Sequence, residues 1–355
     1  MLSGNNLYLI VALTFFLVLT YVFMSSLLLL RLANYFREKR QNKFTSLWQD
    51  EVLDYLTSQS DPKTIVARIP KSSYPDLIFF LASFFLHLKG EDLEQLKKLV
   101  TESDLKTYFI KNLKNFRKKK RVEAIYFLRF VKGDDVVNLL AGELGESNEM
   151  IFRTAVESLA YLDAVTMIDQ ILDAAKSRKQ FTGDSILSMI IKFDRTICEP
   201  LTKRLAIEKD YEIQQIIITV LWHFKYAEAL DVILKILVYS GNKALILESI
   251  RYLGEIENID SVNSLRFFLN HSRADIRAAA IRAISKIGDT SNEDKIIKRI
   301  NDKDLEVKIA AAYAMYNGSR DAKSKLFELA WNSPNKEVST VANRIILEKR
   351  ILENA

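Results

Sequence analysis

Two columns of small and aliphatic residues recur along the chain at a spacing of about 31 residues. The first column contains Leu128, Leu159, Ile190, Leu221, Leu253, Ile284, Met315 and Ile346. The second column, four residues earlier in each case, contains Ala124, Ala155, Ile186, Ile217, Ser249, Ala280, Ala311 and Ala342. A fixed period of this length is typical of stacked units that bury their apolar faces only against one another. The pattern therefore predicts one elongated array over residues 121–355.

Each unit of this array is predicted to contain two helices. The longer one carries both columns, as in the amphipathic stretch from Asp275 to Gly288, where apolar residues recur three and four apart. The shorter one is represented by 261–269 and by 292–300, and polar turns follow at 301–304 and 332–335. Only 10 Gly and 5 Pro occur, which favours helices joined by short turns. The expected fold is all-α, a right-handed α-solenoid.

The N-terminal region contains an uncharged stretch of 24 residues, Leu7 to Leu30. As a helix it would be about 36 Å long, enough to cross a hydrocarbon core of about 30 Å. A signal peptide is the alternative, but residues 1–6 carry no basic side chain and the apolar run is long. The sequence predicts a short tail at 1–6 and a retained transmembrane helix at 7–30.

Basic residues follow the predicted span and none precedes it. These flanking residues are Arg31, Arg37, Lys39, Arg40 and Lys43, accompanied only by Glu38. By the positive-inside rule, the residues after the span are cytoplasmic and the N-terminus lies outside. The expectation is a single-pass protein of the inner (plasma) membrane with a cytoplasmic solenoid.

Residues 31–60 are predicted to form a basic juxtamembrane helix. It is interpreted mainly as a connector that caps the first repeat, with contact along anionic headgroups as the alternative. Residues 61–120 are expected to form irregular helical repeats, because proline breaks occur at 62, 70 and 75 and the 31-residue register is missing. The apolar stretch 75–86 is too short to span a bilayer and predicts a buried core helix, followed by an amphipathic helix at 91–100.

The densest run of positive charge lies at 111–121. Seven of its eleven residues are basic, namely Lys111, Lys114, Arg117, Lys118, Lys119, Lys120 and Arg121. A solvated loop between helices is the default interpretation, and a patch that contacts anionic lipid or an acidic protein is the main alternative. Nucleic acid is disfavoured, because a phosphate-binding protein would repeat its basic residues along one face.

The composition limits the chemistry that the chain can perform. The 355 residues are 49% hydrophobic and 27% charged with a net charge of +6, which is typical of a globular protein. A single cysteine, Cys198, excludes an internal disulfide. His87, His223 and His271 are far apart and have no metal-ligand spacing. With no phosphate-binding glycine loop or nucleophile motif, no cofactor, metal, catalytic residue or small-molecule substrate is predicted.

The C-terminal units resemble HEAT repeats. Residues 304–315 are similar to the second helix of that family, and so are residues 275–287. The family places an aspartate in the turn and a basic residue after a valine, which Asp302 and Lys308 match. In the preceding unit Arg277 matches but His271 replaces the aspartate, and in the last unit Ser333 and Ser339 replace both. The resemblance is closest over 240–350, weaker over 121–240 and weakest over 61–120.

The resemblance implies a scaffold that binds other macromolecules along a concave surface. We therefore expect a non-enzymatic, membrane-tethered adaptor whose partner is a protein, in particular a membrane protein or membrane enzyme complex. Similar anchored bacterial proteins accompany membrane enzymes such as polysaccharide glycosyltransferases. The alternatives are an enzyme on a HEAT-like scaffold, such as a bilin lyase, and a nucleic-acid-binding HEAT protein.

One polar column on the second helices is a candidate binding surface, because in HEAT arrays these helices usually line the concave side. It lies two residues before the first column and contains Tyr126, Glu157, Ser188, Thr219, Arg251, Arg282, Tyr313 and Arg344. Its C-terminal members, Arg251, Arg282, Tyr313 and Arg344, are of residue types enriched at binding hot spots. A groove for an acidic protein segment is the resulting hypothesis. The alternative is that this column is simply the solvated face of each helix.

Overall fold

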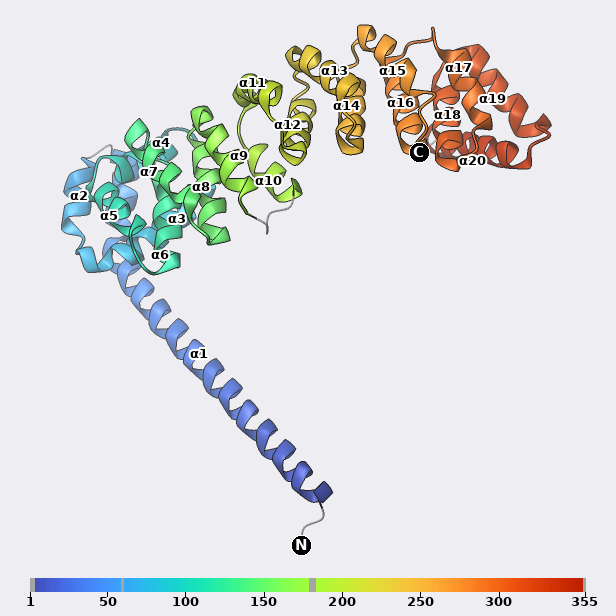
Figure 1. Cartoon of the computed structure of the whole chain (residues 1–355). Helices are drawn as coiled ribbons and strands as arrows, with labels where there is room; N and C mark the ends of the chain where they lie inside the picture. Colours follow the sequence, from blue (N-terminus) through green and yellow to red (C-terminus); the bar gives the residue numbers. More distant parts are fainter. Residues whose placement is uncertain (1–3, 59–60, 179–182, 354–355) are drawn as a thin grey trace. The chain divides into compact units, whose positions relative to one another are not determined.

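The computed structural model describes residues 4–58, 61–178 and 183–353, which form α-helices, short 3-10 helices and turns, with no β-strand in those ranges (Figure 1). The predicted all-α class is therefore confirmed. Contacts within the chain separate two compact units, Met1–Val136 and Val137–Ala355. This boundary lies inside α7 (Asp134–Gly142), whereas the 31-residue period begins at about residue 121. The two units are described separately.

The first unit is built on one long helix, α1 (Gly4–Ser58), which runs without a break through both the predicted span and the predicted connector. Its side chains from residue 12 to residue 43 are exposed except for Ser25 and Gln41, and burial begins at Phe44. Val52, Tyr55 and Leu56 are then buried against the other helices of this unit. These are α2 (Pro62–Arg68), α3 (Tyr74–His87), α4 (Gly90–Thr101), α5 (Asp104–Leu113) and α6 (Lys118–Leu128).

The prolines of the first unit mark helix starts. Pro62 occupies the first turn of α2, where Asp61 caps the helix by accepting hydrogen bonds from the amides of Lys63 and Thr64. Pro75 lies in the first turn of α3. The prediction that α3 is buried almost all round is wrong on one side, because Phe79 is exposed while Leu77 and Leu81 are fully buried.

The second unit is a double row of helices. The longer, second helices of the repeats are α8 (Glu149–Tyr161), α10 (Gly183–Ile190), α12 (Tyr211–His223), α14 (Lys243–Ile256), α16 (Ala274–Ile287), α18 (Leu305–Asn317) and α20 (Lys336–Glu353). The first helices are α9 (Ile168–Lys176), α11 (Cys198–Ile207), α13 (Leu230–Tyr239), α15 (Val262–Phe268), α17 (Glu293–Lys298) and α19 (Arg320–Asn332). Consecutive second helices pack on one another from α8 to α20, and from α11 onward each first helix packs on the second helix that follows it.

Both sequence columns form the interior of this stack. Every residue of the two columns is buried, from Ala124 and Leu128 at one end to Ala342 and Ile346 at the other. Small side chains in the second column let neighbouring helices approach, while aliphatic side chains in the first column fill the layer between them. The predicted repeat register is therefore confirmed at each of its positions.

The repeat also sets where the second helices begin and end. Side-chain caps recur at their N-termini, where Asn148, Asp210, Asn242, Asp304 and Asn335 accept hydrogen bonds from amides of the first turn. Left-handed residues recur after their last turn, at Asp163, Lys225, Glu257 and Gly288 with φ of 51°, 48°, 57° and 79°. Gly288 ends α16 as the sequence predicts, since glycine reaches this conformation without a Cβ clash.

A buried ion pair accounts for the polar positions of the HEAT signature. The Arg277 guanidinium donates to both carboxylate oxygens of Asp302 at 2.9 and 2.6 Å, and the two side chains are only 5% and 4% exposed. The pair joins one repeat to the next. In the following repeat Lys308 is paired with Glu337, because Ser333 occupies the position of the aspartate.

Candidate partner-binding surface

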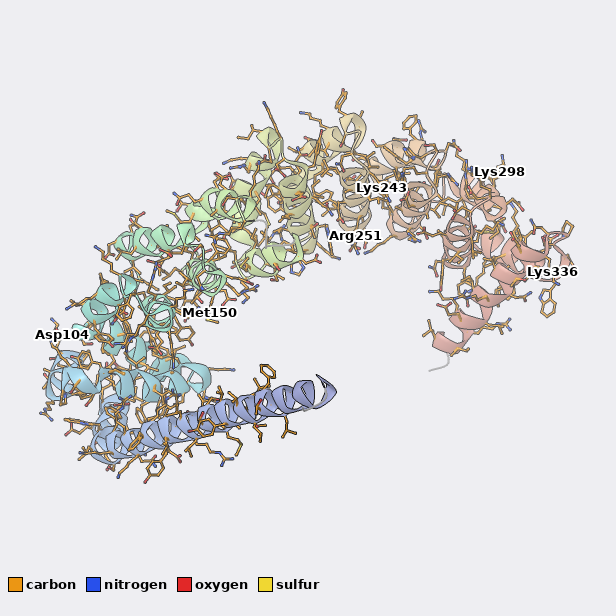
Figure 2. All side chains as sticks on the ribbon, turned by 60° about the horizontal axis from the view of Figure 1, so that its bottom comes forward. Asp104, Met150, Lys243, Arg251, Lys298 and Lys336 are labelled. Carbon is orange, nitrogen blue, oxygen red and sulfur yellow. The ribbon has the colours of Figure 1, made fainter. Side chains whose placement is uncertain are left out.

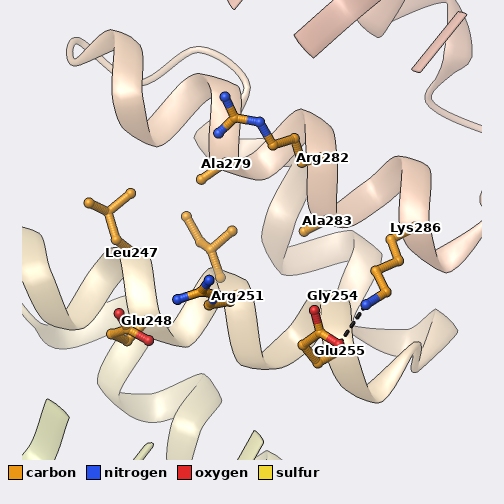
Figure 3. Close-up of a pocket in the computed structure, with 10 residues that line it drawn as sticks. Leu247, Glu248, Arg251, Gly254, Glu255, Ala279, Arg282, Ala283 and Lys286 are labelled. Atoms are coloured by element: carbon orange, nitrogen blue, oxygen red, sulfur yellow. Dashed lines mark hydrogen bonds and ion pairs between the residues drawn. The ribbon is translucent and has the colours of Figure 1, made fainter. Parts of the chain in front are cut away.

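A hollow of about 360 Å³ lies between α14 and α16 (Figure 3). Its apolar lining is provided by Leu247, Ile250, Gly254, Ala279 and Ala283. The two helices are closest at Gly254, where an added Cβ would lie 3.0 Å from the Cα of Ala283. Charged side chains surround this apolar floor, namely Glu248, Arg251, Glu255, Arg282 and Lys286.

The charges around the hollow are largely matched within the chain. Figure 3 shows Lys286 and Glu255 pointing toward one another from the two helices, with Nζ and Oε2 2.5 Å apart. Arg282 forms a second ion pair with Glu306 of α18 at 2.7 Å. Both pairs are substantially exposed, so solvent screens them and they are weak contributors to stability.

Arg251 differs from these residues because its partner is an aromatic ring. Its guanidinium lies 4.8 Å from the ring centre of Trp222 on α12, a cation–π contact between neighbouring repeats. Figure 2 labels Lys243 at the start of α14 and Arg251 further along the same helix. Arg251 and Glu248 also line a second hollow, of about 840 Å³, that extends over α10 and α12.

The remaining members of the polar column are also engaged with adjacent repeats. The Tyr313 hydroxyl donates to Glu348 of α20, and this hydrogen bond, with partial burial, raises the pKa of Tyr313. Glu157 is paired with Lys192, and the Thr219 hydroxyl lies 3.4 Å from Glu248. Arg344 is exposed on α20. The column is therefore a ladder of contacts between repeats and not a row of unpaired cations.

Sequence reasoning missed several residues that shape this surface. Glu255 and Lys286 lie 31 positions apart and have opposite charge, so the repeat period alone predicts their pairing. Trp222 lies one position after the first column, and only the structure shows that its ring supports Arg251. Gly254 carries no signal in the sequence that distinguishes a close helix contact from a neutral replacement.

The predicted membrane helix agrees with the described part of α1. Ala12–Leu56 is long and apolar enough to cross a membrane, with a mean hydropathy of 2.3 and no burial in its most apolar window. By length and composition a signal sequence near the N-terminus passes the same test. Among the predicted flanking residues, Arg31, Arg37, Lys39 and Lys43 are exposed. Arg40 instead donates to the buried carboxylate of Asp76 on α3 at 2.8 Å.

The basic run at 111–121 spans the end of α5, a loop and the start of α6. Lys111, Lys114, Arg117, Lys118 and Lys119 are exposed, whereas Lys120 and Arg121 are partly covered. The structure places this run in the first unit. The polar column from Glu157 onward belongs to the second unit, so the two are separate candidate surfaces.

The candidate chemical groups are arranged as structural residues. Cys198 is fully buried at the start of α11, and burial raises the pKa of its thiol to about 11, which keeps it protonated and unreactive. His87 Nδ1 lies 2.7 Å from the carbonyl oxygen of Ser83 within α3. Across the part of the chain that the structure describes, no group of three or more His, Cys, Asp or Glu side chains is placed to hold a metal ion.

Comparison with known proteins agrees with this geometry. Residues 265–345 match a family model described as HEAT repeats. A crystal structure of a Kap121p mutant resembles the chain with a TM-score of 0.50 at 12% identity, covering 85% of this chain and 42% of that one. The karyopherin Kap121p bound to the SUMO protease Ulp1p gives a TM-score of 0.50 at 12% identity, covering 78% and 37%. The chain thus spans less than half the length of Kap121p, and at this identity the likeness is one of fold. Comparison with curated proteins gave no match.

Proposed function

The chain carries HEAT repeats, and we propose that it is a non-enzymatic scaffold, held at the plasma membrane by α1, that binds a protein partner along its second helices. The observation that carries this proposal is the hollow between α14 and α16. Its apolar floor, rimmed by charged side chains, has the anatomy of an interface centre and rim. The solved Kap121p complexes, which hold protein partners, support this use of the fold.

The membrane tether is supported by the exposure of α1. An apolar surface of this size does not stay in water, and the described residues from 12 to 30 have no other helix against them. The same helix continues directly into the segment from Phe44 to Leu56 that packs in the first unit. This continuity favours a retained anchor over a cleaved signal sequence. The basic flank after the span supports a cytoplasmic position for the repeats.

The proposed partner is a membrane protein or a membrane enzyme complex, of which polysaccharide glycosyltransferases are one class. Confinement to the same bilayer raises the effective concentration of the partner, so moderate affinity is sufficient for a stable association. The charged rim around the hollow would then select the partner. A partner segment must supply groups that replace the existing pairs, because an unpaired charge at an interface is costly.

The proposal is tested by crosslinking in native membranes. A photocrosslinking amino acid replaces Leu247, which lines the hollow, and in a matched control it replaces the exposed Val238 of α13. We expect one discrete membrane-protein adduct from position 247 and none from position 238. Equal adduct formation at both positions, or none at 247, would contradict the proposed binding face.

Charge reversal provides the specificity control for that adduct. The test variant combines Arg251→Glu, Arg282→Glu and Arg344→Glu on second helices. The control variant combines Lys235→Glu, Arg266→Glu and Lys298→Glu, which are exposed residues of first helices and give the same change in net charge. We expect the adduct to be lost in the test variant and kept in the control, with unchanged helical circular dichroism in both. Retention in the test variant would exclude the charged rim as the determinant.

A further inference from the structure

The loop between α5 and α6 exposes an aromatic ring among cations. Phe116 is 88% exposed, the highest value among the large hydrophobic side chains that the structure describes. Its neighbours Lys114, Arg117 and Lys118 are exposed, and so are Lys111 and Lys119. We refer to Phe116 with these five basic residues as the cationic surface. It adjoins a hollow of about 1080 Å³ lined by Lys111, Lys114, Phe116 and the aromatic rings of Tyr74 and Tyr108.

The charges of this surface work against the local fold. Arg117 is the N-cap of α6 and contributes no side-chain cap, and no acidic residue lies in the first turn. Three lysines instead follow at the positive end of the helix dipole, which disfavours cations. The acidic neighbours give little relief, since Glu123 lies 4.0 Å from Lys119 and Asp104 is paired with Lys71. Helix stability therefore does not explain why positive charge gathers here.

Contacts within the first unit place the cationic surface at the end from which α1 departs. The pairs Arg40–Asp76 and Phe44–Phe80 show that α3 runs parallel to α1, so the start of α3 faces the apolar part of α1. Tyr74, at the start of α3, stacks edge-on against Tyr108 of α5 with ring centres 5.4 Å apart. Tyr108 lines the hollow beside the cationic surface. In Figure 1, α6 likewise lies near the point where α1 leaves the other helices.

We propose that the cationic surface rests on the anionic headgroups of the membrane that α1 enters, with Phe116 inserted among them. This inference rests on the membrane tether of the proposed function. Arg40, where α1 meets α3, is ten residues beyond Leu30, which as a helix is roughly 15 Å. The headgroup layer accounts for about 5–7 Å of this distance. The remaining gap is comparable to the Debye length of about 8 Å at physiological ionic strength.

Anionic lipid fits this surface better than an acidic protein or a nucleic acid. Basic side chains around a single exposed aromatic ring combine headgroup attraction with shallow insertion, as at other membrane surfaces. The tether holds the surface near lipid whether or not any other partner is present. The five exposed cations gather on one loop and the helix ends beside it, so they form no track along which a nucleic-acid backbone could run.

The test uses the full-length chain in lipid nanodiscs. Phe116→Cys is labelled with an environment-sensitive fluorophore, while the buried Cys198 stays unlabelled in the folded protein. Tyr239→Cys is the matched control, because Tyr239 is 85% exposed and lies on α13 of the second unit. Nanodiscs of phosphatidylcholine alone are compared with nanodiscs that also contain phosphatidylglycerol.

We expect a blue shift and quenching by spin-labelled lipid at position 116 only, and only in the anionic nanodiscs. High salt removes both signals. The combined variant Lys111→Gln, Lys114→Gln, Lys118→Gln and Lys119→Gln also removes them, since at about fivefold per basic side chain the membrane-bound population falls roughly 600-fold. Helical circular dichroism stays unchanged, because the substitutions relieve the unfavourable charges at the start of α6.

Three results overturn the inference, and they differ in what they say about the tether. A probe at 116 that remains aqueous in anionic nanodiscs excludes lipid contact while leaving the anchored scaffold intact, and leaves an acidic protein as the remaining ligand. An equal shift in neutral nanodiscs shows that charge does not drive the contact. If the chain washes off the nanodiscs at alkaline pH, the tether itself fails and the inference fails with it.

Discussion

Replacement of Arg277 by methionine tests whether the buried ion pair joins the C-terminal repeats. The substitution removes both short hydrogen bonds to Asp302 and leaves that carboxylate at 4% exposure. The remaining donors are Arg299 Nη1 at 3.4 Å and the amide of Asp304 at 3.1 Å, which satisfy it only in part. A buried charge deprived of its partner costs about 3–5 kcal/mol, and we expect a loss of this size.

The chain contains a matched control one repeat later. Lys308 is as buried as Arg277, but its partner Glu337 has a side chain that is 73% exposed. In Lys308→Met the carboxylate turns to water, so we expect a loss of only about 1 kcal/mol. The double variant Arg277→Met/Asp302→Leu removes both buried charges and should recover most of the stability lost in the single variant.

The assay must resolve individual repeats, because a solenoid does not unfold as one two-state unit. Urea unfolding monitored by circular dichroism gives the overall loss, and hydrogen exchange of the amides in α16 and α18 gives the local one. Two outcomes refute the reasoning. One is an equal loss in Arg277→Met and Lys308→Met. The other is a double variant that is no more stable than Arg277→Met.

The same pair predicts a pH dependence. Burial alone would raise the pKa of Asp302, but hydrogen bonds from Arg277 and the Asp304 amide, with the Arg277 charge, hold it below its ordinary value. Because the folded-state pKa is lower than the unfolded value of about 3.9, the pair stabilises the fold above that pH. This contribution is lost as the pH falls through the folded-state pKa. Arg277→Met should therefore show a flatter acid unfolding curve than the unmodified chain.

Three further substitutions follow from the backbone and the core. Glu257→Gly should raise the urea midpoint, by about 1 kcal/mol at most, because Glu257 holds a left-handed conformation, and Gly288→Ala should lower it by a similar amount. Gly254→Val should cost about 1–3 kcal/mol, since its side chain meets Ala283 on α16, and hydrogen exchange should show the loss in α14 and α16. Cys198 should not react with maleimide in the folded protein at pH 8 and should react fully in urea, because burial raises its pKa to about 11; rapid labelling of the folded chain would contradict its burial.

The repeat register could be read from the sequence because it depends on a translation along the stack. A residue such as Ile284 has the same environment as Leu253 and Met315, and a steady period shows this without coordinates. The first unit has no such period. The pairing of Arg40 with the buried Asp76 therefore could not be predicted, and Arg40 was assigned only to the membrane flank.

The polar column shows the limit of a periodic pattern. The pattern places Arg282 and Tyr313 in equivalent positions, but their partners Glu306 and Glu348 lie 24 and 35 residues further on. The reach and rotamer of each side chain decide its partner, and these do not follow a backbone period. Exposure of the column could therefore be predicted, whereas its charge balance could not.

The paired charges along the second helices change what binding at this surface would involve. A free row of arginines would attract any polyanion, and its affinity would fall steeply with salt. At Arg282 a partner must instead displace Glu306, and near Lys286 it must compete with Glu255. Each such exchange returns little net electrostatic energy, so affinity must come from the apolar floor and discrimination from the rim. A surface of this kind suits a protein that is already confined to the same bilayer, where local concentration compensates for weak intrinsic affinity.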